Sequence, residues 1–275
     1  MPKTCSVRAQ PAYLFLTRPI RLIRLITAFT AAAWVAASPA AAAPFEDTIA
    51  QRTMACTGCH GPQGRAGPDG YYPRLAGKPA GYLYHQLLNF RDGRRHYDLM
   101  TQLIAPLDDA YLMEIAQYFS RLEAPYPAPL PASASPGVMR HGQQLVMQGD
   151  ATRRLPACVQ CHGQAMTGVA PSIPGLLGLP RDYLNAQLGA WKAGQRRAHA
   201  PDCMKNVVDL LTLEDINAVA SWIAAQPLPP STKPASTLPA LPPGAAAITC
   251  GSAADAPAVP VLPVTPAGPA RKAQK

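Results

Sequence analysis

The stretch Cys56-Thr57-Gly58-Cys59-His60 returns as Cys158-Val159-Gln160-Cys161-His162, and a glycine follows each copy. Cysteines at i and i+3 of a helical turn present both sulfurs to one side, where they can form thioethers with the two vinyl groups of a haem. The next residue, histidine, then faces the iron as its proximal ligand. The pattern therefore predicts two covalently bound haem c groups, with thioethers from Cys56, Cys59, Cys158 and Cys161 and iron ligation by His60 and His162.

Two other uses of a C-x-x-C-H motif fit this chain less well. A zinc site would need a fourth ligand for each Cys-Cys-His set, and no second pair follows at finger spacing. A thioredoxin-like redox pair would need a β-α-β setting, which the sequence does not indicate. Covalent haem attachment is the interpretation that accounts for both copies.

The two motifs belong to a longer internal repeat. Pro73-x-Leu75-x-Gly77 matches Pro174-x-Leu176-x-Gly178, and the segment from Tyr82 to Arg95 matches the segment from Tyr183 to Arg196 at a constant offset of 101 residues. Each repeat ends in a segment with apolar residues at helical spacing, and Asp108 and Thr212 are the N-cap candidates of the two predicted helices. The apolar positions are Leu112, Ile115, Ala116 and Phe119 in the first repeat and Ile216, Val219, Ala220 and Ile223 in the second. No sustained alternating pattern indicates strands, so we predict an all-α fold.

Each proximal histidine needs a partner on the opposite face of the iron. Met100 lies seven residues before Leu107, and Met204 lies seven residues before Leu211, so these two methionines correspond in the repeat. The other candidates, which are His85, His96, Met113, Met166 and His199, show no such correspondence or lie on the wrong side. Methionine in a core is usually a gap filler, but two aligned methionines in polar loops favour axial ligation by Met100 and Met204.

The basic charge of the chain is concentrated at its ends. The leader, residues 1–43, has five basic residues and no acid ahead of an apolar run from Leu25 to Ala37, the layout of a secretory signal peptide cleaved near residue 43. That run is shorter than the roughly 20 residues that span a bilayer, so an uncleaved membrane anchor is the weaker alternative to a cleaved leader. Membrane contact is expected to be peripheral or through a partner. The leader and the tail hold most of the net charge of +9. The segment between them therefore has no basic patch that would indicate nucleic-acid binding.

Proline marks the segments that bracket the repeats. Five prolines lie between Ala124 and Pro136, and 12 of the 32 lie after residue 226 in a stretch without hydrophobic periodicity. The predicted organisation is a signal peptide at 1–43, a first domain at 44–124, a linker at 125–134, a second domain at 135–226 and a disordered Pro/Ala-rich tail at 227–275. Cys203 and Cys250 are the mature cysteines left over, and they form a disulfide or remain two free thiols.

The paired motifs, the P-x-L-x-G turns, the Tyr-Leu-x-x-Gln-Leu segments and the loop methionines resemble the periplasmic diheme cytochrome c4 family over about residues 45–226. The resemblance implies two tandem class I cytochrome c domains, each wrapped around a haem with His/Met ligation. It also implies that the carbonyls of Pro73 and Pro174 accept hydrogen bonds from the proximal imidazoles. Arg95 and Arg196 align and are candidates to pair with haem propionates, with ordinary solvated arginines as the alternative.

Filled axial positions on both irons predict an electron carrier and not an enzyme. The resemblance implies periplasmic electron transfer between redox proteins, such as a membrane-bound quinol-oxidising complex, a terminal oxidase or a periplasmic dehydrogenase. One alternative is a haem c subunit of a dehydrogenase or oxidase complex. The other is a diheme peroxidase-type enzyme, which would need a displaced or missing sixth ligand.

Overall fold

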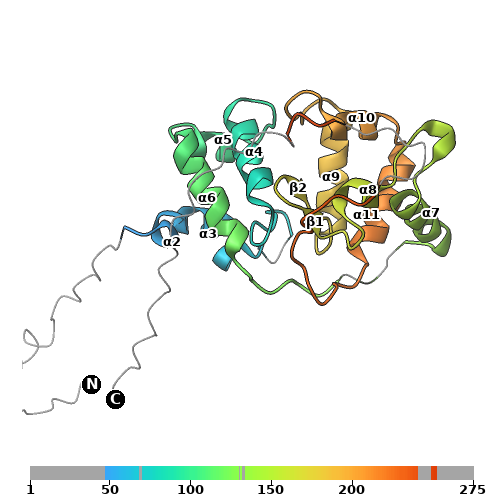
Figure 1. Ribbon diagram of the computed structural model, residues 1–275, viewed down its shortest axis with the longest axis horizontal. Coiled ribbons are helices and arrows are strands. Elements are labelled where there is room, and N and C mark those ends of the chain that lie inside the picture. The colour runs from blue at the N-terminus through green and yellow to red at the C-terminus, as the bar shows by residue number, and fades with distance from the viewer. Residues whose placement is uncertain (1–46, 68–69, 130, 132–133, 241–248, 253–275) are drawn as a thin grey trace, which may run out of the picture. The chain divides into compact units, whose positions relative to one another are not determined.

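The computed structural model describes residues 47–67, 70–129, 131, 134–240 and 249–252, which lie in a unit that begins at Asp47. The predicted signal peptide lies outside the described residues. In the first repeat the helices are α2 (Ile49–Arg52), α3 (Met54–His60), α4 (Ala80–Arg91), α5 (Asp98–Ile104) and α6 (Asp109–Arg121), with a 3-10 turn at Pro62–Gly64. In the second they are α7 (Pro136–Met147), α8 (Cys158–His162), α9 (Arg181–Lys192), α10 (Cys203–Asp209) and α11 (Leu213–Ala224), with a 3-10 turn at Ala151–Arg153. Figure 1 shows the two sets next to each other, each with its own C-x-x-C-H helix, α3 in the first and α8 in the second.

The described part of the chain is mostly helical, as predicted. Its strands are β1 (Gly168–Val169) and β2 (Ile173–Pro174), which form a short antiparallel hairpin in the second repeat. Two-residue strands leave no alternating pattern in the sequence, which is why the hairpin was not expected.

Each repeat has its own hydrophobic core. In the first, α4 packs against α6, which buries Leu112, Ile115, Ala116 and Phe119. In the second, α7 and α9 pack against α11, which buries Ile216, Val219, Ala220 and Ile223. These eight residues are the apolar positions that the helical spacing predicted, so the sequence-based assignment of both terminal helices is confirmed.

The predicted N-caps of these two helices are also confirmed. The Asp108 carboxylate accepts a hydrogen bond from the amide of Tyr111 at 2.8 Å. Thr212 and Asp215 form a reciprocal capping box, in which the Thr212 hydroxyl accepts from the Asp215 amide at 3.1 Å and the Asp215 carboxylate accepts from the Thr212 amide at 2.8 Å. Each cap satisfies amides that the first helical turn leaves without partners.

Arg74 attaches the start of the proline-rich linker to the first repeat. Its buried guanidinium donates to the carbonyls of Ala76 at 2.9 Å and Pro125 at 2.8 Å, and also to the carbonyl of Ala124. The guanidinium also lies 3.7 Å from the centre of the Tyr126 ring. The linker therefore leaves the first domain along a course that side-chain contacts define.

Two parts of the tail contact the second repeat, contrary to the expectation of a tail that is disordered throughout. Ala235 donates to the Gly168 carbonyl at 2.9 Å and accepts from the Ala170 amide at 2.8 Å, beside β1. Farther on, Cys250 forms a disulfide with Cys203 at the start of α10. The disulfide is one of the two states that the sequence left open for these cysteines. The pairing of Ala235 with Gly168 and Ala170 joins residues far apart in the chain, and local composition cannot reveal it. Residues 253–275 lie outside the described part.

Candidate functional site

The two C-x-x-C-H motifs form short helices that end at their histidines. α3 and α8 end at His60 and His162, and the glycine after each has positive φ, 74° at Gly61 and 84° at Gly163. Glycine adopts this conformation without the steric cost that a Cβ imposes. A side chain at Gly61 would also overlap the Ala66 carbonyl. The glycine that follows each motif therefore lets the chain turn away directly after the histidine.

Both histidines are buried and make the same hydrogen bond. The Nδ1 atom of His60 lies 2.8 Å from the Pro73 carbonyl, and that of His162 lies 2.7 Å from the Pro174 carbonyl. Because a carbonyl can only accept, Nδ1 carries the proton, and the lone pair is left on Nε2. Burial lowers the pKa of both imidazoles, which favours the neutral form that binds metal. The geometry is the one that the family resemblance implied for the two prolines.

The four motif cysteines are free thiols in this structure. Burial raises the pKa of Cys56 and Cys161, and it raises the pKa of Cys158 to about 12. A thiolate-dependent redox pair would need the opposite shift. The thiols of Cys56, Cys158 and Cys161 are therefore held in the protonated form, whereas Cys59 is exposed.

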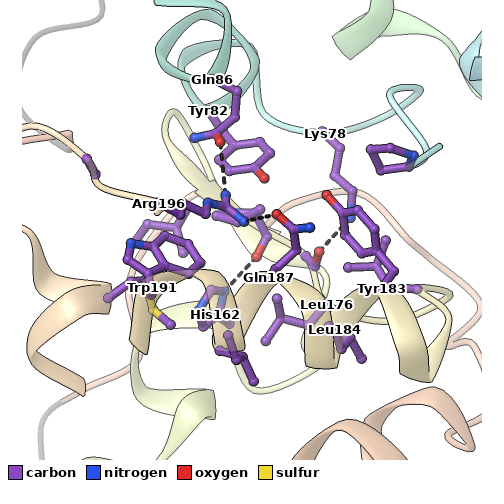
Figure 2. Close-up of a pocket in the computed structure, with 18 of the residues that line it drawn as sticks. Lys78, Tyr82, Gln86, His162, Leu176, Tyr183, Leu184, Gln187, Trp191 and Arg196 are labelled. Carbon is purple, nitrogen blue, oxygen red and sulfur yellow. Dashed lines mark hydrogen bonds between the residues drawn. The ribbon is translucent and has the colours of Figure 1, made fainter. Parts of the chain in front are cut away.

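A cavity of about 2260 Å³ adjoins both motifs. It is much larger than the roughly 300–1,000 Å³ of a typical small-molecule pocket. His60 and His162 line it, together with Cys56, Cys158 and Cys161. Apolar side chains from the helices of both repeats make up most of its wall, and Figure 2 shows part of that wall around His162. Free thiols, neutral imidazoles and a large apolar cavity fit two haem c groups.

Among the proposed sixth ligands, Met100 on α5 and Met204 on α10 both line the cavity. By contrast, Met113 and Met166 are buried in the two hydrophobic cores. His96 also lines the cavity, but its side chain is exposed.

His85 and His199 lie against each other, with ring centres 5.6 Å apart. Neither ring belongs to the cavity wall described above. Of the candidate sixth ligands, Met100, Met204 and His96 therefore line the cavity.

Arg95 and Arg196 meet between the repeats, where two glutamines bridge them. The Gln86 side-chain carbonyl accepts from Arg95 and from Arg196 at 2.9 Å each. The Gln187 side-chain carbonyl accepts from the same two arginines at 2.7 and 2.6 Å. Figure 2 shows Arg196 between the two glutamines, above Trp191. Both arginines line the cavity; Arg196 is buried and Arg95 is half-buried.

The arginine pair carries positive charge without a carboxylate partner among the described residues. Arg196 is 4% exposed, and burial together with Arg95 lowers its pKa to about 10. Its guanidinium lies 3.7 Å from the centre of the Trp191 ring, and that of Arg95 lies 4.4 Å from the Phe90 ring. The bridging glutamines were aligned in the repeat but not assigned a role. That alignment was the signal that could have found them.

Comparisons with known proteins agree with this site. The chain is 38% identical over 219 residues to a thiosulfate dehydrogenase electron acceptor from Thiomonas intermedia, and the aligned region covers 79% of this chain and 96% of the relative. It is 30% identical over 174 residues to cytochrome c4 from Pseudomonas aeruginosa, and the aligned region covers 62% of this chain and 84% of the relative. No family model matches the chain.

Solved structures have the same fold. Cytochrome c4 from Pseudomonas stutzeri superposes with a TM-score of 0.55 at 28% identity, over 66% of this chain and 99% of that one. A thiosulfate dehydrogenase from Marichromatium purpuratum superposes with a TM-score of 0.57 at 33% identity, over 63% of this chain but only 36% of that one. With two haem c motifs and these relatives, the chain belongs to the family of diheme electron-transfer cytochromes that includes cytochrome c4 and the thiosulfate dehydrogenase electron acceptors.

Proposed function

We propose that this cytochrome accepts electrons from a thiosulfate dehydrogenase in the periplasm and passes them on one at a time. The observation that carries the proposal is the match to the Thiomonas intermedia electron acceptor, which extends over 96% of that relative. The similarity to about a third of a thiosulfate dehydrogenase chain supports the same pairing. The onward acceptor is a terminal oxidase or another membrane-bound or periplasmic redox protein.

The site residues divide into three roles. Cys56, Cys59, Cys158 and Cys161 attach the two haems, His60 and His162 are the proximal ligands, and Met100 and Met204 are the distal ligands. A haem iron held in this way supplies a centre that takes up and releases one electron at a time. The Pro73 and Pro174 carbonyls fix the imidazole rings and make them more basic ligands.

Arg95 and Arg196 act as the partners of haem propionates. The two guanidiniums lie at the cavity with neutral glutamine acceptors, so they have hydrogen-bonding capacity and charge left for an anionic group. A carboxylate there would make charge-assisted hydrogen bonds, which are stronger than those to an amide. The pair would then stabilise the haems and the contact between the repeats together.

Secretion into the periplasm follows from the leader at residues 1–43, whose basic and apolar segments fit a signal peptide. Within the described residues, the longest apolar helices are too short to cross a bilayer. The tail after residue 226 is an addition to the repeats, and a docking role for it would favour a permanent complex with the dehydrogenase.

The test uses the oxidised holoprotein, a purified thiosulfate dehydrogenase and thiosulfate. We expect the reduced haem absorbance bands to appear only when enzyme and thiosulfate are both present, and to reach two electrons per chain. A monohaem cytochrome c from an unrelated pathway serves as the control acceptor. Reduction no faster than that of the control would contradict the proposed partner, and it would leave the assignment as a diheme electron carrier intact.

A further inference from the structure

Lys78 belongs to the first repeat but binds the second. It lies in the turn between Gly77 and Pro79 that leads into α4, and its ammonium donates to the Gly175 carbonyl at 2.5 Å. Figure 2 shows the Lys78 side chain reaching from the segment before α4 toward the loop of the second repeat that also accepts the hydrogen bond from His162. Lys78 is 4% exposed, so it is not a surface lysine that happens to touch a neighbour.

The fold of the repeat does not need a lysine at this position. At the constant offset of 101 residues, the counterpart of Lys78 is Leu179, which is buried in the core of the second repeat. Leucine is therefore an adequate side chain for this turn. Lysine in its place costs desolvation energy, and packing alone does not explain it.

The ammonium lies next to the hydrogen bond that orients the proximal histidine. Gly175, its acceptor, directly follows Pro174, whose carbonyl accepts from His162. The electrostatic effect of Lys78 reaches the imidazole, where it contributes to the lowered pKa of His162. The first repeat has no equivalent contact among the described residues. His60 receives its nearby positive charge from Arg95 of its own repeat.

The charge on Lys78 is not neutralised within the described residues. An ammonium has three N–H donors, and a single backbone carbonyl accepts from this one. Burial, with a smaller contribution from Arg74, lowers the pKa of Lys78 to about 7. Lys78 also lines the haem cavity. The propionate carboxylates of a bound haem are the anionic groups that would keep Lys78 protonated in this cavity.

We infer that Lys78 is a positioning residue for the second haem, through which the first repeat places a positive charge beside His162 and raises the reduction potential of that haem. A positive charge stabilises the state that carries the additional electron, and it does so strongly where protein has replaced water. The inference rests on the proposed ligation of the second iron by His162. It makes the electron affinity of one haem depend on the other repeat.

The experiment compares holoproteins with Lys78→Gln, Lys78→Met and Lys78→Arg in a spectroelectrochemical titration that resolves the two one-electron waves. The wave of the second haem is identified beforehand as the one that Met204→Ala moves. We expect both neutral variants to lower the equilibrium constant for reduction of the second haem about tenfold, which is 59 mV for one electron. Lys78→Arg keeps the charge and should restore most of the potential.

Lys233→Gln is the matched control, because it removes the same charge from a side chain that is 73% exposed and pairs with Glu123. Its two waves should stay where they are in the wild type. Equal shifts of both waves in the neutral Lys78 variants, or no shift, would overturn the inference.

Failure to load the second haem is a separate outcome. If neither neutral variant loads this haem while Lys78→Arg does, Lys78 serves haem retention and not tuning, which also overturns the inference. Haem content and absorbance bands are measured in every variant. Two haems with unshifted potentials would therefore leave the proposed function standing while this inference fails.

Discussion

His60 and His162 carry the same arrangement twice, a buried imidazole whose Nδ1–H is fixed by a proline carbonyl. One hydrogen bond sets the tautomer, and the tautomer decides which nitrogen can bind iron. The methionines differ in their surroundings. Met100 is in the third position of α5, whereas Met204 follows directly after a disulfide-bonded cysteine in α10. The two irons are therefore expected to have the same types of ligand, but the two methionine ligands are held in place by different local structure.

Replacing each methionine with alanine should open one iron at a time. We expect Met100→Ala and Met204→Ala each to lose half of the absorbance due to methionine–iron coordination, because only one of two sixth ligands is removed. Each reduced variant should bind one carbon monoxide per chain, and the wild type should bind none without denaturant. Met147→Ala, at a side chain that is 39% exposed on α7, should behave like the wild type. Carbon monoxide binding by the reduced wild type would show that one haem lacks a bound sixth ligand.

At the scale of elements, the packing of α7 on α11 depends on a glycine. A Cβ at Gly142 would overlap the Ala218 carbonyl and the Cβ of Trp222, so the two helices can approach this closely only because position 142 has no side chain. Gly189 on α9 has no atom within 4 Å of such a Cβ, although it is also a helical glycine. Both positions are helical glycines, so alanine has the same intrinsic helix propensity at each. They differ in whether an added Cβ has room.

Gly142→Ala should destabilise the holoprotein by about 1–3 kcal/mol, the usual cost of overpacking a tight contact. Gly189→Ala should be neutral or stabilising by up to about 1 kcal/mol, since alanine is the better helix former and has free space there. Free energies of unfolding from urea titrations test both. Equal effects of the two substitutions would contradict the close approach of α7 and α11.

At the scale of the whole molecule, the tail is part of the second haem site. Pro201, Cys203 and Met204 line the cavity, and so do Cys250 and Ser252 from the tail. The Gly251 amide adds a hydrogen bond to the Pro201 carbonyl at 3.0 Å. The loop before Met204 is three residues longer than the loop before Met100, and a longer loop has more conformational freedom to lose. The disulfide supplies a restraint that this loop needs more than its counterpart.

Removing the disulfide should loosen this loop. With the cysteines 47 positions apart in the sequence, loop-closure entropy predicts that Cys203→Ser with Cys250→Ser lowers the free energy of unfolding by about 2–4 kcal/mol. With its irons reduced, the double variant should also bind carbon monoxide at the second haem, which the wild type does not do without denaturant. Cys250→Ser alone should have the same effects, because it breaks the same bond and keeps the Cys203 thiol. Unchanged unfolding midpoints in both variants would contradict this role of the tail.

The sequence by itself determined the haem motifs, the repeat, the helical class and the caps at Asp108 and Thr212, and it predicted axial ligation by Met100 and Met204. Each of these follows from neighbouring residues, or from comparison of one repeat with the other. Only the tertiary structure decided the contact of Lys78 with Gly175, the bridging of Arg95 and Arg196 by Gln86 and Gln187, and the pairing of Ala235 with β1. Those of these contacts that cross between the repeats or reach the tail join residues from about 65 to 110 positions apart. Such pairs depend on how the repeats and the tail pack together, and local spacing does not encode that packing.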